Sequence, residues 1–251
     1  MRIVTLPGAP PLAVRLRPVT GQDELAVAPA DPGAAIALLG RLASDAGGTP
    51  LAIPELTVFQ ADRLLAAIYD MLYGARADCR LRCGGCGEGY EFTLLLPELI
   101  AAQDAARPPP APDGAWTMAD GRRVRAPRLA DLAAAEGPAA LLARLVVEGD
   151  PAAAPEAANA FLDVAAPTLA VDLGAQCPHC GAAETVRFDL ARYLAQRLAA
   201  ERPFLLREAH LIAARYGWSH AEIMALSRED RRAFAGLIEA ERTALAWRRA
   251  G

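Results

Sequence analysis

The sequence predicts an α+β protein in which two cysteine-bearing β-hairpins are flanked by helices and followed by a C-terminal helical bundle. Two observations predict the hairpins: the motif C-x-x-C-G occurs twice, and an alternating, strand-like segment follows each copy. A third observation predicts the helices, because apolar residues recur at helical spacing over much of the remaining chain.

The two motifs are Cys83-Gly84-Gly85-Cys86-Gly87 and Cys177-Pro178-His179-Cys180-Gly181. The segments that follow them, 90–94 and 186–190, alternate in the same way, so the two regions form a pseudo-repeat. Two thiolates two residues apart can grip one metal ion from a tight turn, and two such turns supply a closed tetrahedral zinc site. The sequence therefore predicts an interrupted zinc ribbon with one structural zinc ion per chain. Its four ligands would be Cys83, Cys86, Cys177 and Cys180.

Alternatives for these cysteines stay open. More than ninety residues separate the two pairs, whereas zinc-finger pairs normally lie about 15–20 residues apart, so the pairing is an inference. A redox-active C-x-x-C pair normally opens a helix that lowers the thiol pKa, but strands follow these pairs. Cys79 could replace one ligand, although a small half-buried strand residue is the expectation there. His179 is expected to point outward.

The composition limits which classes of protein this chain can belong to. The chain has 251 residues, of which 53% are hydrophobic, enough for one large domain or two small ones. All 26 basic residues are arginine, and the net charge of −4 argues against a nucleic-acid binder with a basic surface. The sequence lacks a run of about 18 uninterrupted apolar residues, so we expect no membrane span. The N-terminal segment lacks a signal-peptide core, and metal-binding cysteines fit a cytoplasmic protein.

The N-terminal unit, residues 1–106, is predicted to contain helices and the first cysteine turn. Its expected elements are a strand at 12–18, a helical turn after Thr20, helices at 31–42, 57–73 and 97–106, and strands at 78–82 and 90–94. Thr57 and Gln60 form a capping box for the helix at 57–73, with Asp62 and Arg63 on the side opposite its apolar residues.

A proline-rich linker at 107–114 is predicted to be extended and to lead into a hairpin and helical insertion at 115–165. The hairpin turns at Asp120-Gly121, and helices are expected at 129–136, 138–147 and 156–165. The unit at 166–200 holds a strand at 168–173, the second cysteine turn and a helix at 191–200.

The C-terminal unit, residues 201–251, is predicted to be a bundle of three helices. The first starts at Arg202-Pro203 and ends at Gly217, and its inner side is expected to carry Leu206, His210, Ala213 and Leu211. Ser219 and Ser227 cap the second and third helices. The arrangement resembles a helix-turn-helix, but the segment 221–226 lacks the Arg, Asn or Gln side chains that read bases.

Catalysis is not predicted. The three histidines, His179, His210 and His220, have no serine or cysteine nucleophile motif around them, and His210 is expected to be a half-buried packing residue. The sequence contains no phosphate-binding loop and no zinc-protease motif. We therefore expect a protein that is not an enzyme and has no small-molecule substrate.

Several blocks in order resemble a known family. They are 16–21, 56–57 with the helix to Tyr73-Gly74, the first cysteine motif, 125–127, the second cysteine motif, Phe188-Asp189, and Tyr216-Gly217-Trp218-Ser219 followed by Arg231-Arg232. Together they are similar to the T-even-type phage baseplate hub assembly chaperone family, found in tailed phages and related contractile injection systems. The resemblance spans most of the chain, and the last block and the cysteine turns match best.

The resemblance implies a non-enzymatic assembly chaperone or adaptor, with baseplate hub or spike proteins as partners. The first rival is a DNA-binding regulator that uses the zinc ribbon and the C-terminal helices. The second rival is a thiol oxidoreductase that uses the cysteine pairs. The resemblance does not name the client protein.

Overall fold

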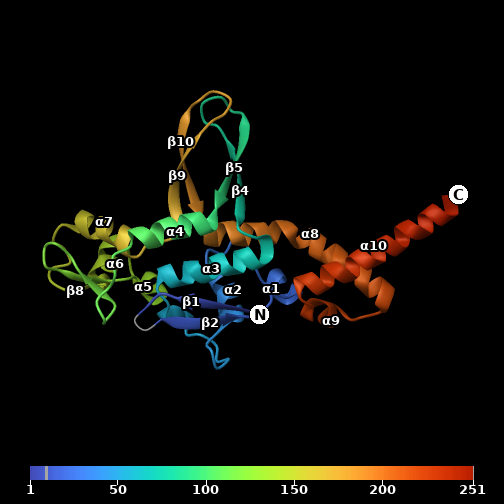
Figure 1. Ribbon diagram of the computed structural model, residues 1–251, viewed down its shortest axis with the longest axis horizontal. Coiled ribbons are helices and arrows are strands. Elements are labelled where there is room, and N and C mark those ends of the chain that lie inside the picture. Colours follow the sequence, from blue (N-terminus) through green and yellow to red (C-terminus); the bar gives the residue numbers. More distant parts are fainter. Residues whose placement is uncertain (9–10, 251) are drawn as a thin grey trace.

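The computed structural model describes the backbone of residues 1–8 and 11–250, together with their side chains except those of residues 245, 246 and 248–250. Residue 251, the last of the predicted C-terminal unit, lies outside the described residues. The protein is a mixed α and β structure with a helical body, a projecting pair of β-hairpins, a lateral insertion and a C-terminal helical bundle (Figure 1).

The body packs a small antiparallel sheet, in the order β1-β2-β3, against three helices. Its elements are β1 (Arg2–Leu6), β2 (Leu12–Leu16), α1 (Gly21–Leu25), α2 (Ala34–Leu42), β3 (Ala43–Ser44), the short helix η1 (Ile53–Glu55) and α3 (Val58–Tyr73). The first half of α8 (Leu190–Tyr216) completes the core, in which Leu39, Leu64 and Leu190 are fully buried. The sequence predicted neither β1 nor β3.

Helix α3 confirms the predicted capping box, because Gln60 N–H donates to Thr57 Oγ1 at 3.2 Å and Thr57 N–H donates to Gln60 Oε1 at 3.0 Å. Asp62 and Arg63 were predicted on the side of α3 opposite its apolar residues, and the structure shows that this side is covered too. Both are buried, because later parts of the chain cover that side: Asp62 accepts the Leu169 N–H, and Arg63 pairs with Asp104.

Two hairpins of equal length stand side by side on the body and meet at their tips (Figure 1). They are β4 (Arg76–Arg82) with β5 (Gly89–Leu95), and β9 (Ala170–Gln176) with β10 (Ala183–Asp189). Each hairpin runs directly into a helix, α4 (Leu96–Ala106) or α8, where helices were expected at 97–106 and 191–200.

The insertion has a core of its own, in which Trp116, Val124 and Leu142 are buried. Its elements are β6 (Ala115–Thr117), β7 (Arg123–Arg125), α5 (Leu129–Ala134), α6 (Pro138–Leu145), β8 (Val146–Glu148) and α7 (Pro155–Ala165). The predicted helix at 138–147 ends two residues early, because Val146–Glu148 pairs with β7 as a third strand. The proline-rich segment before the insertion is held on both sides: Arg107 Nε donates to Ala165 O, and Trp116 Nε1 donates to Pro108 O.

The C-terminal part consists of the second half of α8, then α9 (His220–Ala225) and α10 (Arg228–Ala250). The predicted helix break at Arg202-Pro203 is absent, because α8 continues through Pro203 with Leu198 and Leu205 buried on either side of it. The expected inner face was right for Leu211 and Ala213, which pack in the C-terminal core, and wrong for Leu206 and His210, which are exposed. Ile212 is buried in that core as well.

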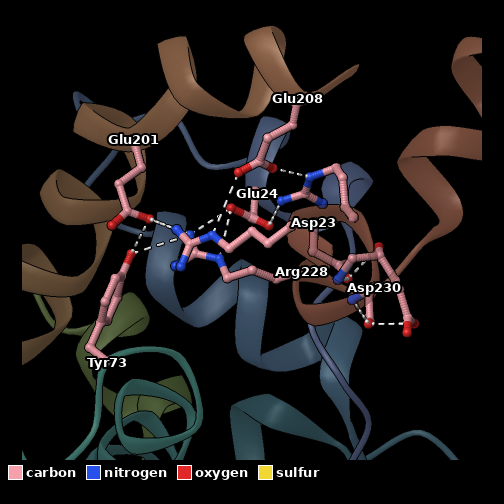
Figure 2. A network of polar contacts seen from close by, with 11 residues as sticks. Asp23, Glu24, Tyr73, Glu201, Glu208, Arg228 and Asp230 are labelled. Carbon is pink, nitrogen blue, oxygen red and sulfur yellow. Dashed lines mark hydrogen bonds and ion pairs between the residues drawn. The ribbon is translucent and has the colours of Figure 1, made fainter. Parts of the chain in front are cut away.

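A buried network of charged residues joins this C-terminal part to the body (Figure 2). Glu24 of α1 accepts from Arg228 at 2.6 Å and from Arg231 at 2.7 Å, and Arg231 also pairs with Glu208 of α8. Arg231 is 1% exposed. At Gly21, an added Cβ would lie 2.9 Å from Met224 Sδ, so glycine allows α1 to approach α9 this closely.

Candidate metal centre

The tips of the two hairpins bring together the four predicted cysteines. Their sulfur atoms all lie within 4.8 Å of one another. Cys83 Sγ is 3.7 Å from Cys180 Sγ, and Cys86 Sγ is 3.8 Å from Cys177 Sγ. Four sulfurs bound tetrahedrally at about 2.3 Å from a zinc ion would lie about 3.8 Å apart. The spacing therefore suits a tetrahedral metal site and is far longer than a disulfide bond.

Both cysteine turns have the same backbone geometry. Gly87 N–H donates to Cys83 O and Gly181 N–H donates to Cys177 O, each at 2.9 Å. The two glycines have φ angles of 76° and 74°, a region that other residues rarely enter. The turn therefore requires the glycine of C-x-x-C-G, since it returns the chain to the second strand.

The surroundings of the sulfurs are asymmetric. Cys83 and Cys177 are 2% and 1% exposed, whereas Cys86 and Cys180 face solvent. Burial raises the pKa of Cys177, but the backbone N–H groups of Cys180 and His179 outweigh it and bring this pKa to about 7. The backbone N–H of Glu88 lowers the pKa of Cys86, but burial and neighbouring thiols raise it to about 12. A bound cation would favour the thiolate forms of these cysteines.

Glu184 bridges the two turns. Its carboxylate accepts the Gly84 N–H at 2.6 Å and the Tyr90 O–H at 2.8 Å. The Glu184 bond and burial raise the pKa of Tyr90 to about 12, so its hydroxyl stays protonated as a donor. Sequence reasoning missed this pair, although each residue lies four positions after the second cysteine of its motif. An alignment of the two halves of the pseudo-repeat could therefore have indicated this pair.

The other candidate residues lie elsewhere. Cys79 is buried against the body core and takes no part in the cluster. His179, His210 and His220 are all exposed. Among the described residues, the four cysteines are the group of three or more Cys, His, Asp and Glu side chains placed to share a metal ion.

Four thiolates are a donor set for zinc and for iron, and they fill a tetrahedral site without leaving an open position for a substrate. Bound there, a metal would cross-link segments far apart in the sequence. Comparisons of the chain with protein-family models, curated proteins and solved structures found no match. In the described part of the chain, no helix is both long and apolar enough to cross a membrane.

Proposed function

We propose that Cys83, Cys86, Cys177 and Cys180 bind one structural zinc ion, which makes the paired hairpins an interrupted zinc ribbon. The sulfur spacing supports this proposal, because it agrees with a tetrahedral tetrathiolate site. The matching turns support it too, since both present backbone N–H groups to sulfur; Gly85 N–H, for example, lies 3.3 Å from Cys83 Sγ. A redox role is disfavoured because the pairs lie on hairpin turns and not at helix starts.

We propose further that the protein is a non-enzymatic assembly chaperone or adaptor for the baseplate hub of a phage tail or contractile injection system. The observation that carries this proposal is the ordered set of sequence blocks that resemble that family. Residues of the last of these blocks also stabilise the C-terminal helices. Tyr216 and Trp218 stack at 5.3 Å and both pack on Phe234, while Ser219 caps α9.

The surface of the C-terminal helices suits a protein partner. Phe204, Leu237 and Trp247 are 60%, 58% and 76% exposed, which is costly for large apolar side chains in water. Partner binding would remove this surface from water. A bound zinc ion would meanwhile hold the tips of the two hairpins together.

The test is affinity purification of the tagged protein from its native host while the tail genes are expressed, with mass spectrometry of the recovered proteins. We expect hub or spike proteins, absent when an untagged strain is treated in the same way. Deletion of the gene should leave tails without complete baseplates in electron micrographs. Recovery of DNA-associated proteins alone, with salt-sensitive binding of the purified protein to duplex DNA, would overturn the proposal in favour of a regulator.

A further inference from the structure

A groove crosses the face of the body between β1 and α4, with α3 as its floor. It encloses about 480 Å³. Ala66 and Ala67 of α3 lie beneath it, and Leu96, Ile100 and Ala101 of α4 form one wall. The opposite wall is β1, and the three elements lie one after another across the molecule (Figure 1).

The β1 wall is the free edge of a sheet. In the order β1-β2-β3, β1 pairs with β2 alone among the described strands. Its other edge presents backbone N–H and C=O groups, which are a template for another strand. Ile3 on β1 is 65% exposed, and Met1 just before it is 70% exposed. An added strand would cover both the polar edge and part of this apolar surface.

The charges in the groove are already paired. Arg2 binds Asp70 near one end, and Arg63 binds Asp104 at 2.9 Å near the other. Two positive and two negative side chains leave no net charge to attract an ionic ligand. Between Arg63 and Asp70 the helix rises about 10 Å, which matches about three residues of extended strand.

We propose that this groove binds an extended, uncharged segment of another polypeptide, with apolar residues at alternate positions, which adds as a strand to β1. Alternate side chains of such a segment point toward α3 and toward solvent. The inward ones fill the space above Ala66 and Ala67, which the small alanine side chains leave open. The inference rests on β1, α3 and α4 alone, and it stands whether or not the partner belongs to a baseplate.

A second copy of this chain fits the groove less well. Antiparallel pairing of two β1 edges places a twofold axis perpendicular to the sheet, which keeps both helix layers on one side. Each copy carries its own α4 beyond β1, so the two α4 helices would meet in the same space. A single extended segment has no such obstacle.

The test uses the full-length protein and a displayed library of random heptapeptides. We expect enrichment of sequences that alternate apolar and polar residues. One synthetic peptide from this selection should shift the amide NMR signals of Arg2–Leu6 and of α4. Ala101→Arg, which fills the groove from the exposed face of α4, should weaken binding about tenfold or more. Ala102→Arg, the exposed neighbour outside the groove, should leave binding unchanged.

Three results would overturn the proposal. One is a selection that enriches no peptide. Another is a selected peptide that binds the Ala101→Arg variant as tightly as the parent, or that shifts signals elsewhere only. The third is concentration-dependent dimerisation that Ala101→Arg abolishes, which would identify a second copy as the occupant.

Discussion

At the scale of single residues, Glu184 is the clearest case of a side chain that supports the cysteine cluster without belonging to it. Each of its two carboxylate oxygens accepts one hydrogen bond from the opposite hairpin. Gly84 N–H donates to one oxygen and Tyr90 O–H donates to the other. Partners of this kind orient the ligands, and their loss typically lowers metal affinity by about 10- to 100-fold. The sulfurs alone do not determine how tightly the site holds its ion.

We therefore predict that Glu184→Gln binds zinc about 10- to 100-fold more weakly than the parent, because a neutral amide is a poorer acceptor for both donors. Competition with a chromogenic chelator measures the affinity. Glu91→Gln is the matched control, since Glu91 is an exposed hairpin carboxylate that pairs with Arg80. Equal zinc affinity of parent and Glu184→Gln would contradict the role given to this bridge.

Asp62 is a buried carboxylate whose ionisation opposes folding. Burial raises its pKa to about 6, although the hydrogen bond from Leu169 N–H lowers it in part. Below about pH 4 the carboxyl is protonated in both folded and unfolded chains and costs nothing. Between about pH 4 and 6 the unfolded chain ionises first, so this group destabilises the fold progressively, and above pH 6 the penalty is constant.

Asp62→Asn should remove this penalty while its amide oxygen still accepts the Leu169 N–H. We expect the variant's advantage in unfolding free energy to grow between pH 4 and 6 and to reach about 2–3 kcal/mol at pH 7. Urea unfolding of parent and variant at several pH values measures the difference. Asp70→Asn, a half-exposed position on the same helix, serves as control; an advantage of Asp62→Asn that falls with pH would refute the assignment.

At the scale of elements, the buried ion pairs decide how α10 docks. Arg231 lies between Glu24 of α1 and Glu208 of α8, so it links three helices (Figure 2). Arg228 adds contacts to Glu24 and Glu201 at 2.6 Å. These arginines hold the pKa of Glu24 below its ordinary value despite its burial. Such networks are costly to break because a charge then stays buried without a partner.

Arg231→Met should destabilise the protein by about 3–5 kcal/mol, because Glu24 and Glu208 lose a buried partner. Adding Glu24→Gln should recover part of this loss, since fewer charges then remain unpaired. Arg232→Met is the control: Arg232 is half exposed and contacts Glu201 and Glu208 at longer range, so its loss should cost under about 1 kcal/mol. Similar unfolding free energies for the two single variants would show that the network does not hold α10.

The elements also show which parts of the fold can be predicted from short sequence patterns. Caps such as Thr57 with Gln60 and Ser219 with Glu222 are local, so three or four residues predict them correctly. The strands β1 and β8 depend on partners elsewhere in the chain, and their own residues carry little pattern. Pro203 normally breaks a helix, yet buried residues on both sides stabilise α8 through it. In α8, the burial of these residues outweighs the tendency of proline to end a helix.

The candidate site and its surroundings also contain some contacts that the sequence predicts and others that it does not. The four cysteines could be predicted because thiol pairs with this spacing have a narrow chemical use, although their pairing over ninety residues had to be inferred. The burial of Asp62 and Arg63 could not be predicted from their neighbours in sequence. Arg63 contacts Asp104, 41 positions later, and Asp62 contacts Leu169, 107 positions later. The Glu184–Tyr90 contact was within reach only by superposing the two halves of the pseudo-repeat.

At the scale of the whole molecule, the hairpin tips have a small core separate from the three larger ones. Cys83, Tyr90 and Cys177 form it, with no part in the packing of the body, the insertion or the C-terminal helices. The proposed metal binding would therefore be coupled to the folding of the tips more than to that of the whole protein.

We predict that purified protein contains about one zinc per chain, and that chelation melts the tips while most helix remains. Hydrogen exchange should accelerate in 82–90 and 176–184 with little change in α3, and far-UV circular dichroism should keep its helical signal. Cys83→Ser should lose the metal, whereas Cys79→Ala should retain it, because Cys79 lies outside the cluster. Iron in place of zinc would change the metal assignment, and metal retained by Cys83→Ser would refute the site.

The split arrangement of the hairpins also has a consequence for synthesis on the ribosome. Ninety-one positions separate Cys86 from Cys177. At about 5–20 residues per second, the first pair of thiols waits about 5–20 s before the second is made. A tetrathiolate site can close only after the insertion between them has left the ribosome. Metal capture would then come only after Cys180 has been translated, and it would mark a chain whose two hairpins have paired.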